Sequence, residues 1–280
     1  MQKPTEMITS RQNPLIGLTV KLADRKHRER EGLFRFDGKK LFLEALAADI
    51  PLYAVLLCES AAEVILRAAA AYTLADGCRL VTLPDDLFYR ISEERAPEGV
   101  IVLAHALGGL HRTLDVTGWT HQAPAHNASR VLFLESVRDP GNLGTIIRAA
   151  RAFGADLLVI SADCADIYNP RVLRAAMGTL FSQPIVRTPD LAAVIRAYRE
   201  EGRVFAATLD ENAVTLGTLS FRAGDAVVVG NEGHGLSKEV IDATTGSIFI
   251  PMAEGVESLN AGVAASVLLW ELCRGAGGVM

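Results

Sequence analysis

The segment VVVGNEGHGLS, residues 227–237, combines three glycines with one carboxylate in the manner of a ligand-binding turn. Its valines predict a buried strand, and the residues after the glycines could open a helix. The glycines fall at positions 230, 233 and 235, whereas the dinucleotide fingerprint is G-x-G-x-x-G and the phosphate loop ends in Gly-Lys-Ser or Gly-Lys-Thr. The segment therefore predicts a glycine loop that carries Glu232 after a strand, and it disfavours a nicotinamide-dependent oxidoreductase.

Two further loops place polar side chains where a strand gives way to a helix. In the first, residues 139–141 (Asp-Pro-Gly) predict a turn, Asn142 is a good helix N-cap, and Arg148 follows nearly two turns later. In the second, Ser258 and Asn260 precede the last helix. Each residue taken alone would more often be a cap or a structural ion-pair partner. Only their convergence would indicate a catalytic site.

The chain from residue 130 onward alternates strands with helices, which would bring these loops together. The predicted strands cover 130–136, 156–160, 184–188, 203–209, 226–230 and 247–252, and the predicted helices cover 142–153, 170–181, 190–201 and 260–273. Continuous apolar strands that alternate with helices indicate a parallel sheet covered on both faces. In such sheets ligands bind beyond the carboxyl ends of the strands, where all three loops begin.

The first hundred residues read as a separate α/β unit. Its predicted helices cover 18–31, 37–49 and 61–75, and its predicted strands cover 52–58, 77–84 and 99–106. The following stretch mixes Gly, His, Thr and Pro without periodicity, which is typical of a domain boundary. We therefore predict a domain over 1–106, a linker over 107–129 and a second domain over 130–280.

Composition excludes several classes of protein. Half of the 280 residues are hydrophobic, which indicates that the chain is globular rather than disordered. No apolar run approaches the ~20 residues that span a bilayer, and the first residues do not resemble a secretory signal. The four cysteines form no C-x-x-C pair and the six histidines show no ligand spacing, so we expect no metal and a reducing, cytoplasmic location.

The charge of the chain is unevenly distributed. Residues 1–40 hold ten Lys or Arg against five acids, a local charge of +5 on a chain whose net charge is −5. A localised basic segment can bind phosphates, although such a run on its own is more often a solvated helix face.

Three motifs, in order, resemble those of the SpoU, or TrmH, family of RNA ribose 2′-O-methyltransferases in the SPOUT superfamily. They are NLGTIIRAARAFG, VVVGNEGHGLS and IPMAEGVESLNAGVAASVLLWE, and they lie within about 131–273. Residues 8–45 look like the RNA-binding domain of ribosomal-protein L30e type that precedes the catalytic domain in this family. The resemblance implies a deep trefoil knot in the second domain, and a homodimer that forms through the knotted domain and buries the last helix.

The resemblance also implies the cofactor and its pocket. The cofactor would be S-adenosylmethionine (AdoMet), which contains no phosphate and so needs no phosphate-binding loop. By matching position, Thr208, Gly230, Ile250 and Leu259 would line its pocket.

By the same resemblance, Arg148 acts at the ribose 2′-hydroxyl, Asn142 positions the substrate, and Glu232, Ser258 and Asn260 complete the site. A guanidinium is essentially always protonated, so Arg148 is a poor general base. We therefore favour a role in which Arg148 binds an RNA phosphate or the developing alkoxide. Proton removal then falls to a phosphate, a water or another group.

Four basic residues are the expected RNA contacts: Arg11, Lys21, Lys26 and Arg174. The chain departs from the family pattern at Asp37, where Glu is usual, and at Gly262, where Ser or Ala is usual. We expect the first change to matter little, and the second shortens a side chain beside the site.

The alternative function is a catalytically silent RNA-binding protein of the same fold. The joint presence of all five expected catalytic residues argues against it. The substrate stays open between rRNA and tRNA, and antibiotic-resistance methylases share the same two-domain plan.

Overall fold

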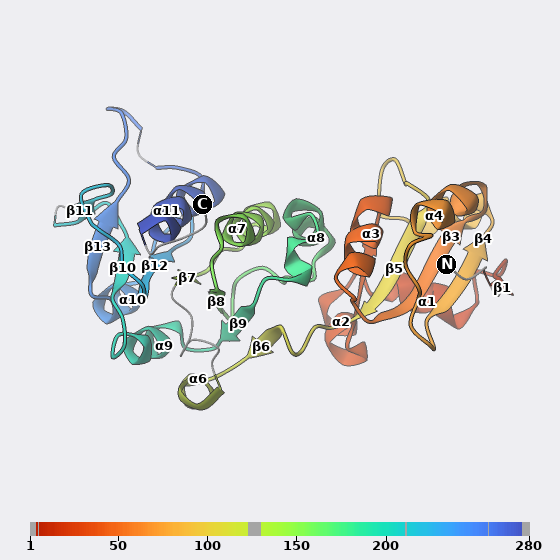
Figure 1. Cartoon of the computed structure of the whole chain (residues 1–280), viewed down its shortest axis with the longest axis horizontal. Coiled ribbons are helices and arrows are strands. Elements are labelled where there is room, and N and C mark those ends of the chain that lie inside the picture. The colour runs from red at the N-terminus through yellow and green to blue at the C-terminus, as the bar shows by residue number, and fades with distance from the viewer. Residues whose placement is uncertain (1–3, 5, 123–129, 211, 257, 276–280) are drawn as a thin grey trace. The chain divides into compact units, whose positions relative to one another are not determined.

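The chain folds into two compact units in the computed structural model (Figure 1). The structure describes residues 4, 6–122, 130–210, 212–256 and 258–275. The first unit comprises Met1–Leu107 and Tyr168–Phe181, and the second comprises Gly108–Ile167 and Ser182–Met280.

The first unit is built on a mixed five-stranded sheet. Its strands, in spatial order, are β1 (Glu6–Met7), β4 (Arg79–Leu83), β3 (Leu52–Cys58), β5 (Val100–His105) and β2 (Leu33–Asp37). β1, β4 and β3 are parallel, whereas β5 runs antiparallel to both β3 and β2. Its helices before residue 107 are α1 (Pro14–Lys21), α2 (Arg25–Glu31), α3 (Lys39–Ala47), η1 (Glu59–Ala61), α4 (Ala62–Ala68) and α5 (Asp85–Ile91).

The single helix predicted over 18–31 is wrong, because α1 and α2 are separate. Asn13 and Asp24 each have an extended ψ, and each side-chain oxygen accepts a hydrogen bond from a backbone N–H of the helix that follows. Asp24 therefore begins a new helix instead of continuing the first one.

The segment Tyr168–Phe181 packs in the first unit, although it follows β8 (Leu157–Ser161) of the second unit in sequence. Its aromatic rings contact β2: the Tyr168 ring stacks on Phe34 at 4.4 Å, and the Phe181 ring lies 5.5 Å from Phe36. The predicted boundaries, which gave all of 130–280 to one domain, missed this excursion. The helix predicted over 170–181 is also too long. It ends early as α8 (Pro170–Ala176), because the next two residues adopt positive φ, and a short turn η3 (Thr179–Phe181) follows.

The second unit contains an eight-stranded, all-parallel sheet, which confirms the predicted sheet class. In spatial order the strands are β11 (Val214–Thr215), β13 (Gly246–Phe249), β10 (Val204–Ala207), β12 (Asp225–Val229), β7 (Arg130–Leu134), β8, β9 (Ile185–Thr188) and β6 (His111–Thr113). β6 and the helix α6 (Val116–Gln122) lie inside the predicted linker. The linker prediction is therefore wrong for these residues, since β6 pairs with β9 at the edge of the sheet.

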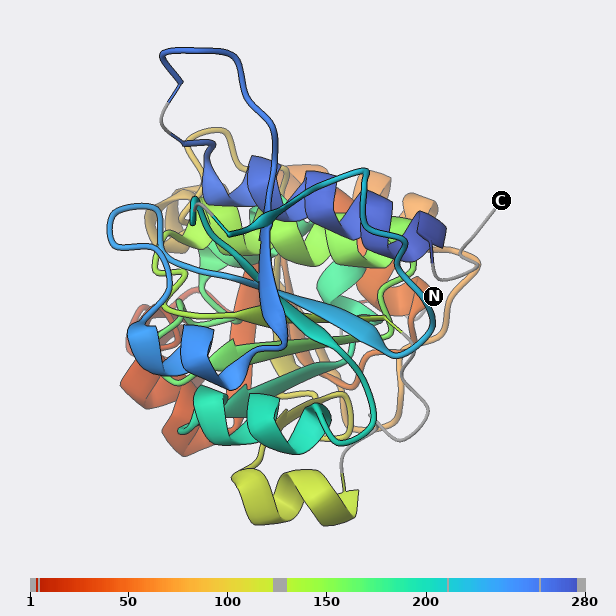
Figure 2. The ribbon, with the colours of Figure 1, turned by 90° about the vertical axis from the view of Figure 1, so that its left-hand side faces the viewer.

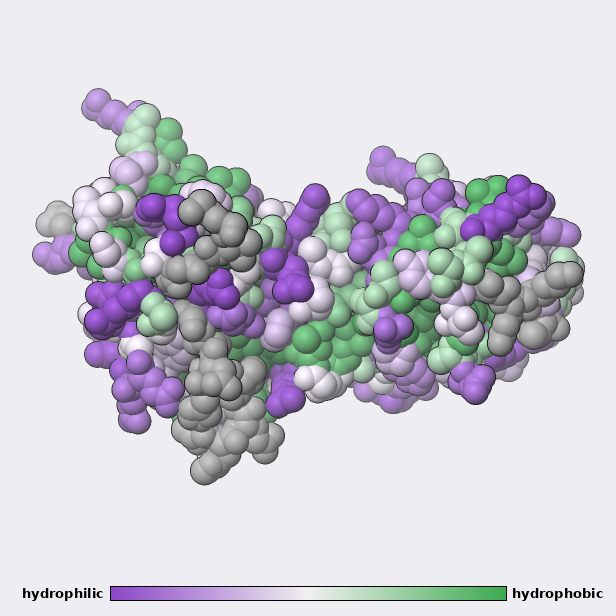
Figure 3. Space-filling model, in the orientation of Figure 1, coloured by the Kyte–Doolittle hydropathy of each residue, from purple (hydrophilic) through white to green (hydrophobic). Residues whose placement is uncertain are grey.

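Helices cover both faces of this sheet (Figure 2). α7 (Pro140–Phe153) and α11 (Ala261–Gly275) lie together on one face, and α9 (Leu191–Tyr198) and α10 (Lys238–Ala243) lie on the other. The chain after β13 projects from the unit before it returns to α11, and hydrophobic side chains gather at the base of this projection (Figure 3). Within the described residues, no helix has the length and apolar character to cross a membrane. The trefoil knot stays a prediction.

Candidate functional site

The order of strands in the second unit reverses between β7 and β12. From β7 the chain adds β8 and β9 on one side, and from β10 it builds the other side of the sheet. β7 and β12 are nevertheless hydrogen-bonded neighbours, so the loops after them leave the same edge of the sheet side by side. Such a reversal opens a crevice in which α/β proteins bind ligands.

Three side chains, those of Asn142, Glu232 and Asn260, form a chain of hydrogen bonds at this crevice, here called the polar chain. The Asn142 amide donates to Oε1 of Glu232, and the Asn260 amide donates to Oδ1 of Asn142 at 2.8 Å. Oδ1 of Asn260 in turn accepts the first backbone N–H groups of α11, from Gly262 at 3.0 Å and Val263 at 3.3 Å. The structure thus brings together one side chain from each of the three loops.

The side chain of Asn142 is free for this contact because it is not the N-cap. The predicted N-cap is wrong by three residues: Asp139 caps α7, and its Oδ1 accepts the backbone N–H of Asn142 at 2.8 Å. Pro140 then occupies the first helical turn, where its missing N–H costs nothing.

A cavity of about 400 Å³ opens beside Glu232, beyond the carboxyl ends of β10, β12 and β13. All four expected cofactor-binding residues line it: Thr208, Gly230, Ile250 and Leu259. Glu232 and Ser258 also line it, so the cavity meets the polar chain. Oγ1 of Thr208 is buried and lacks a hydrogen-bond partner among the described residues. An unsatisfied buried hydroxyl in a ligand-sized cavity is a ready contact for a polar ligand atom.

Gly230 shapes the wall of this cavity. The loop folds back so closely that a Cβ at Gly230 would lie 2.4 Å from the carbonyl oxygen of Gly235. Asn231 holds the fold, because its Oδ1 accepts the backbone N–H of Gly233 at 2.8 Å and its amide donates to the Ser136 carbonyl at 2.9 Å. Only glycine is compatible with this approach, which exposes main-chain groups to the cavity.

Arg148 is exposed on α7 and is not joined to the polar chain. Its guanidinium makes no hydrogen bond or ion pair with any residue that the structure describes. Ser258 is likewise exposed where it lines the cavity. Both groups are therefore accessible to a bound substrate.

A second polar cluster, which sequence reasoning missed, lies after β7 and β8. Asp163 accepts hydrogen bonds from Ser136, Ser161 and Arg138 at 2.6–2.8 Å. Burial acts to raise the pKa of Asp163. The hydrogen bonds from these three donors act in the opposite direction and more strongly, so the pKa is lowered to about 2. The only local signal was the polar dipeptide that ends the predicted strand 130–136, and nothing in it identified the partner 27 residues away.

The four expected RNA contacts all lie in the first unit. Arg11, Lys21, Lys26 and Arg174 are exposed. Arg174 belongs to α8 and packs in the first unit with the rest of Tyr168–Phe181, although the predicted second domain over 130–280 included it.

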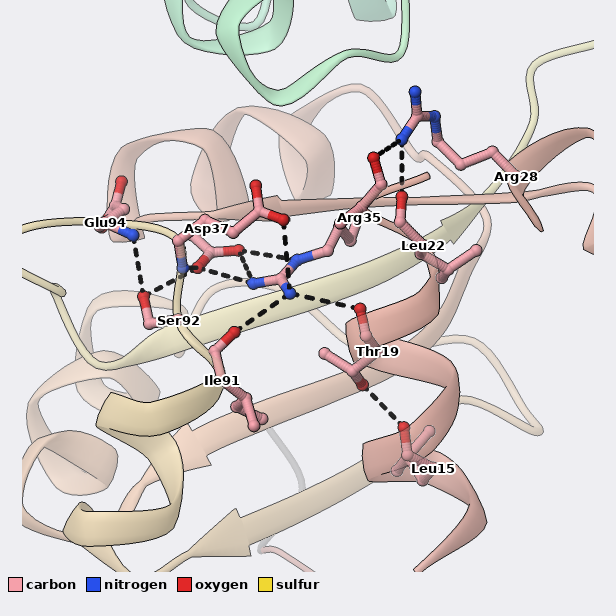
Figure 4. A network of polar contacts seen from close by, with 11 residues as sticks. Leu15, Thr19, Leu22, Arg28, Arg35, Asp37, Ile91, Ser92 and Glu94 are labelled. Atoms are coloured by element: carbon pink, nitrogen blue, oxygen red, sulfur yellow. Dashed lines mark hydrogen bonds and ion pairs between the residues drawn. The ribbon is translucent and has the colours of Figure 1, made fainter. Parts of the chain in front are cut away.

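Two other arginines of the basic segment are buried and structural (Figure 4). Arg28 donates to the carbonyl oxygens of Leu22 and Ala23, both at 2.7 Å, just beyond the end of α1. Arg35 is 1% exposed and forms a two-pronged ion pair with Asp37, with Nη2–Oδ1 and Nη2–Oδ2 distances of 2.7 and 2.9 Å. The local charge of +5 therefore overstates the charge available to RNA.

Nη1 of Arg35 also joins two helices. It donates to the carbonyl oxygens of Thr19 at 3.2 Å and Ile91 at 3.1 Å, so the ends of α1 and α5 lie against one guanidinium (Figure 4). Asp37 accepts further bonds from the Ser92 hydroxyl at 2.9 Å and the Glu93 backbone N–H at 3.1 Å. The Asp37 carboxylate is therefore the centre of a buried network, and the expectation that Asp in place of Glu matters little stays a prediction.

Gly262 lies beside the site, where an added side chain would meet close neighbours. A Cβ at Gly262 would lie 3.1 Å from Oδ1 of Asn260 and 3.3 Å from Cγ2 of Thr145. The glycine lets the start of α11 approach α7 closely, which is where Asn260 reaches Asn142.

Comparison with known proteins links this architecture to RNA methylation. The model of the SpoU rRNA methylase family matches residues 129–270, and that of an MRM3-like substrate-binding domain matches residues 13–102. An uncharacterized tRNA/rRNA methyltransferase of Synechocystis, slr1673, is 30% identical over 95% of this chain and 93% of its own length. The Bacillus subtilis 23S rRNA (guanosine(2553)-2′-O)-methyltransferase RlmP is 28% identical over 95% of this chain and 99% of its own.

Solved structures agree with these relatives. The AdoMet-bound rRNA methyltransferase from Sinorhizobium meliloti superposes with a TM-score of 0.78 at 26% identity, over 96% of this chain and 97% of that one.

Proposed function

Because the chain belongs to the SpoU rRNA methylase family, we propose that it is an AdoMet-dependent methyltransferase that modifies a ribose 2′-hydroxyl of ribosomal RNA. The observation that carries this proposal is the joining of Asn142, Glu232 and Asn260, from three separate loops, at the mouth of one cavity. The cofactor pocket and the polar chain meet beyond the carboxyl ends of the strands, which is where parallel sheets bind their ligands.

The cavity fits AdoMet in size and in chemistry. Thr208 offers an unsatisfied hydroxyl, Gly230 exposes main-chain groups, and Leu259 and Ile250 supply apolar surface. AdoMet bound there supplies an electrophilic methyl group. The protein then needs to align the ribose oxygen and to manage its proton.

The polar chain is suited to hold the ribose. Asn142 uses one amide N–H on Glu232 and its Oδ1 on Asn260, which leaves its second N–H for a substrate oxygen. Glu232 keeps an oxygen that can accept from the 2′-hydroxyl. Because both partners of Asn142 are fixed, its orientation is set before the RNA arrives.

Arg148 supplies a positive charge that no side chain in the described part of the chain neutralises by an ion pair. Its exposed guanidinium can bind a phosphate or the oxygen that develops negative charge as its proton leaves. A positively charged arginine stabilises that oxygen without acting as a base.

Ribosomal RNA is favoured over tRNA by the family, by RlmP of Bacillus subtilis and by the Sinorhizobium meliloti enzyme. The match to a substrate-binding domain lies in the first unit, where Arg11, Lys21 and Lys26 are exposed. Such residues bind structured RNA through its phosphates. All four cysteines are free thiols, which is consistent with action in the cytoplasm.

A homodimer through the second unit is supported by α11. Val263, Val267 and Trp270 follow one another at intervals of four and three residues, and they are 49%, 37% and 53% exposed. Trp270 packs edge-on against Phe153 of α7, which fixes its ring. A fixed aromatic ring in an apolar stripe is typical of the centre of an interface. Replacing Trp270 by Glu should convert a dimer to a monomer in light scattering, whereas a monomeric parent protein would contradict this part of the proposal.

The proposal is tested by incubating the protein with tritiated AdoMet and separate pools of unmodified rRNA and tRNA, and then mapping the labelled ribose. Label confined to a 2′-O position in rRNA supports the proposal. Label confined to tRNA would show that the substrate is tRNA and not rRNA. No label in either pool, together with no AdoMet binding by calorimetry, would identify a catalytically silent RNA-binding protein.

A further inference from the structure

Residues 135–139, here called the strap, connect β7 to α7, and all five are hydrogen-bonded to other parts of the second unit. Glu135 accepts the Ser237 backbone N–H at 2.8 Å. Ser136 has a positive φ of 55°, which its contacts stabilise: its N–H donates to Ser161 Oγ at 2.9 Å, and its carbonyl accepts from Asn231. The Val137 carbonyl accepts the Ala165 N–H at 2.9 Å. The strap is thus fixed along its length.

Asp163 is the anchor of the strap on the β8 side. It accepts from Ser136 and Arg138 of the strap and from Ser161 of its own loop. That loop is itself held by Arg187, whose guanidinium donates to the carbonyl oxygens of Ala162 at 2.7 Å and Ala165 at 3.0 Å. Asp163 therefore presents its carboxylate to Arg138 from a rigid support.

Arg138 is the one strap side chain that this support directs outward. Its Nη2 donates to Asp163 at 2.8 Å, yet the side chain is 66% exposed. The remaining N–H donors of its guanidinium bond to no residue that the structure describes. Ser136 and Asp139, which flank Arg138 in the strap, contact Asn231 and Asn142, so the strap itself joins the glycine loop to the start of α7.

We propose that Arg138, positioned by Asp163, binds a phosphate of the RNA backbone next to the ribose that is methylated. The inference rests on the proposed function and adds a residue that the three motifs did not indicate. A guanidinium has five N–H donors in a planar fork, so one edge can hold Asp163 while another binds phosphate oxygens. Phosphate contacts of this kind fix the register of a nucleic acid on a protein. The AdoMet cavity lies on the other side of β7, over β10, β12 and β13, so Arg138 should affect RNA and not the cofactor.

A matched control for Arg138 exists at the opposite edge of the same sheet. Arg222 is 70% exposed and pairs with Asp225 at 3.8 Å, at the amino end of β12. In both cases the carboxylate keeps other donors when the arginine is removed: Ser136 and Ser161 for Asp163, and Arg203 for Asp225. Arg138→Gln and Arg222→Gln therefore remove the same charge with the same low structural cost.

The test measures methyl transfer to an unmodified 23S rRNA transcript over a series of salt concentrations. For Arg138→Gln we expect the KM for the transcript to rise about tenfold, as for loss of a charge-assisted hydrogen bond. We also expect the slope of log affinity against log salt to fall by about 1, because one fewer counterion is released. Arg138→Lys should keep most of the slope, since it keeps the charge. AdoMet affinity and the melting temperature should stay within error of the parent protein.

A KM and a salt slope for Arg138→Gln equal to those of Arg222→Gln would overturn the inference. A loss of AdoMet binding in Arg138→Gln would do the same, because it would show a structural role. A parent protein that methylates no RNA would instead contradict the proposed function, so the two failures are distinguishable.

Discussion

Arg35 of the first unit differs from Arg138 and Arg148 of the second unit in what its guanidinium binds. In the first unit, Arg35 is buried, and its guanidinium is fully engaged by Asp37 and two helix-end carbonyls. In the second unit, Arg148 is exposed and makes no such contact with described residues, and Arg138 uses one edge of its guanidinium on Asp163.

This difference separates charges that stabilise the fold from charges that can act on a ligand. A buried guanidinium is tolerated only when carboxylates and carbonyls surround it, so it has no donor left for RNA. An exposed guanidinium keeps its donors for a ligand, and Arg138 also follows the carboxyl end of β7, where parallel sheets bind ligands. The net charge of a sequence segment therefore counts buried arginines that cannot bind RNA. It also fails to reveal exposed arginines that lie in an acidic part of the chain.

Breaking the buried pair should give the largest loss of stability. Arg35→Met leaves the Asp37 carboxylate buried without its main partner, which costs about 3–5 kcal/mol. Urea unfolding should show the loss in the transition of the first unit, with the second unit unchanged. Arg35→Met combined with Asp37→Leu should recover much of the loss. A single variant as stable as the parent would contradict the structural role of Arg35.

Adding a methyl group at Gly230, where the backbone lies close to that of Gly235, should mainly weaken cofactor binding. Its new Cβ in Gly230→Ala would meet backbone atoms of Gly235 at 2.4–2.5 Å, and backbone shifts of this kind cost about 1–3 kcal/mol. We expect AdoMet affinity by calorimetry to fall roughly 10- to 100-fold. Gly246→Ala is the control, because its Cβ would meet no atom within 4 Å. Equal affinities for the two variants would exclude the close approach as a feature of the pocket.

The smallest expected effect is the pH dependence that Asp163 contributes. Its pKa lies at about 2 in the folded protein, below the ordinary 3.8, so its ionised form stabilises the fold above pH 4. That contribution disappears as the pH falls from about 4 to 2. The difference in unfolding free energy between the parent and Asp163→Asn should be constant from pH 5 to 7 and shrink below pH 4. A difference that persists unchanged at pH 2 would show that the carboxylate charge is not the cause.

Much of the second unit was predictable because its signals are local. Apolar runs such as 226–230 predict β12, and the alternation of strands with helices predicts the parallel sheet. The convergence of Asn142, Glu232 and Asn260 followed from the sheet class, since all three loops leave carboxyl ends of parallel strands.

The remaining features depend on contacts between distant residues. Nothing near Tyr168 predicts that its ring stacks on Phe34, 134 positions earlier in the sequence. Likewise the charge of Arg35 is visible in the sequence, but its burial follows from the meeting of α1, β2 and α5. The pairing of β6 with β9 is also a long-range contact, and the aperiodic sequence around β6 did not predict it.

The most direct test of the account is the turnover of Arg148→Ala at saturating AdoMet and rRNA transcript. We expect a loss of roughly 100- to 1000-fold, as for removal of a group that stabilises a developing oxyanion. AdoMet affinity and the melting temperature should be unchanged, because Arg148 is exposed and its guanidinium makes no hydrogen bond or ion pair with a described residue. Arg148→Lys should recover only part of the activity. Near-parental turnover in Arg148→Ala would contradict the claim that the exposed guanidinium of Arg148 stabilises the reacting oxygen.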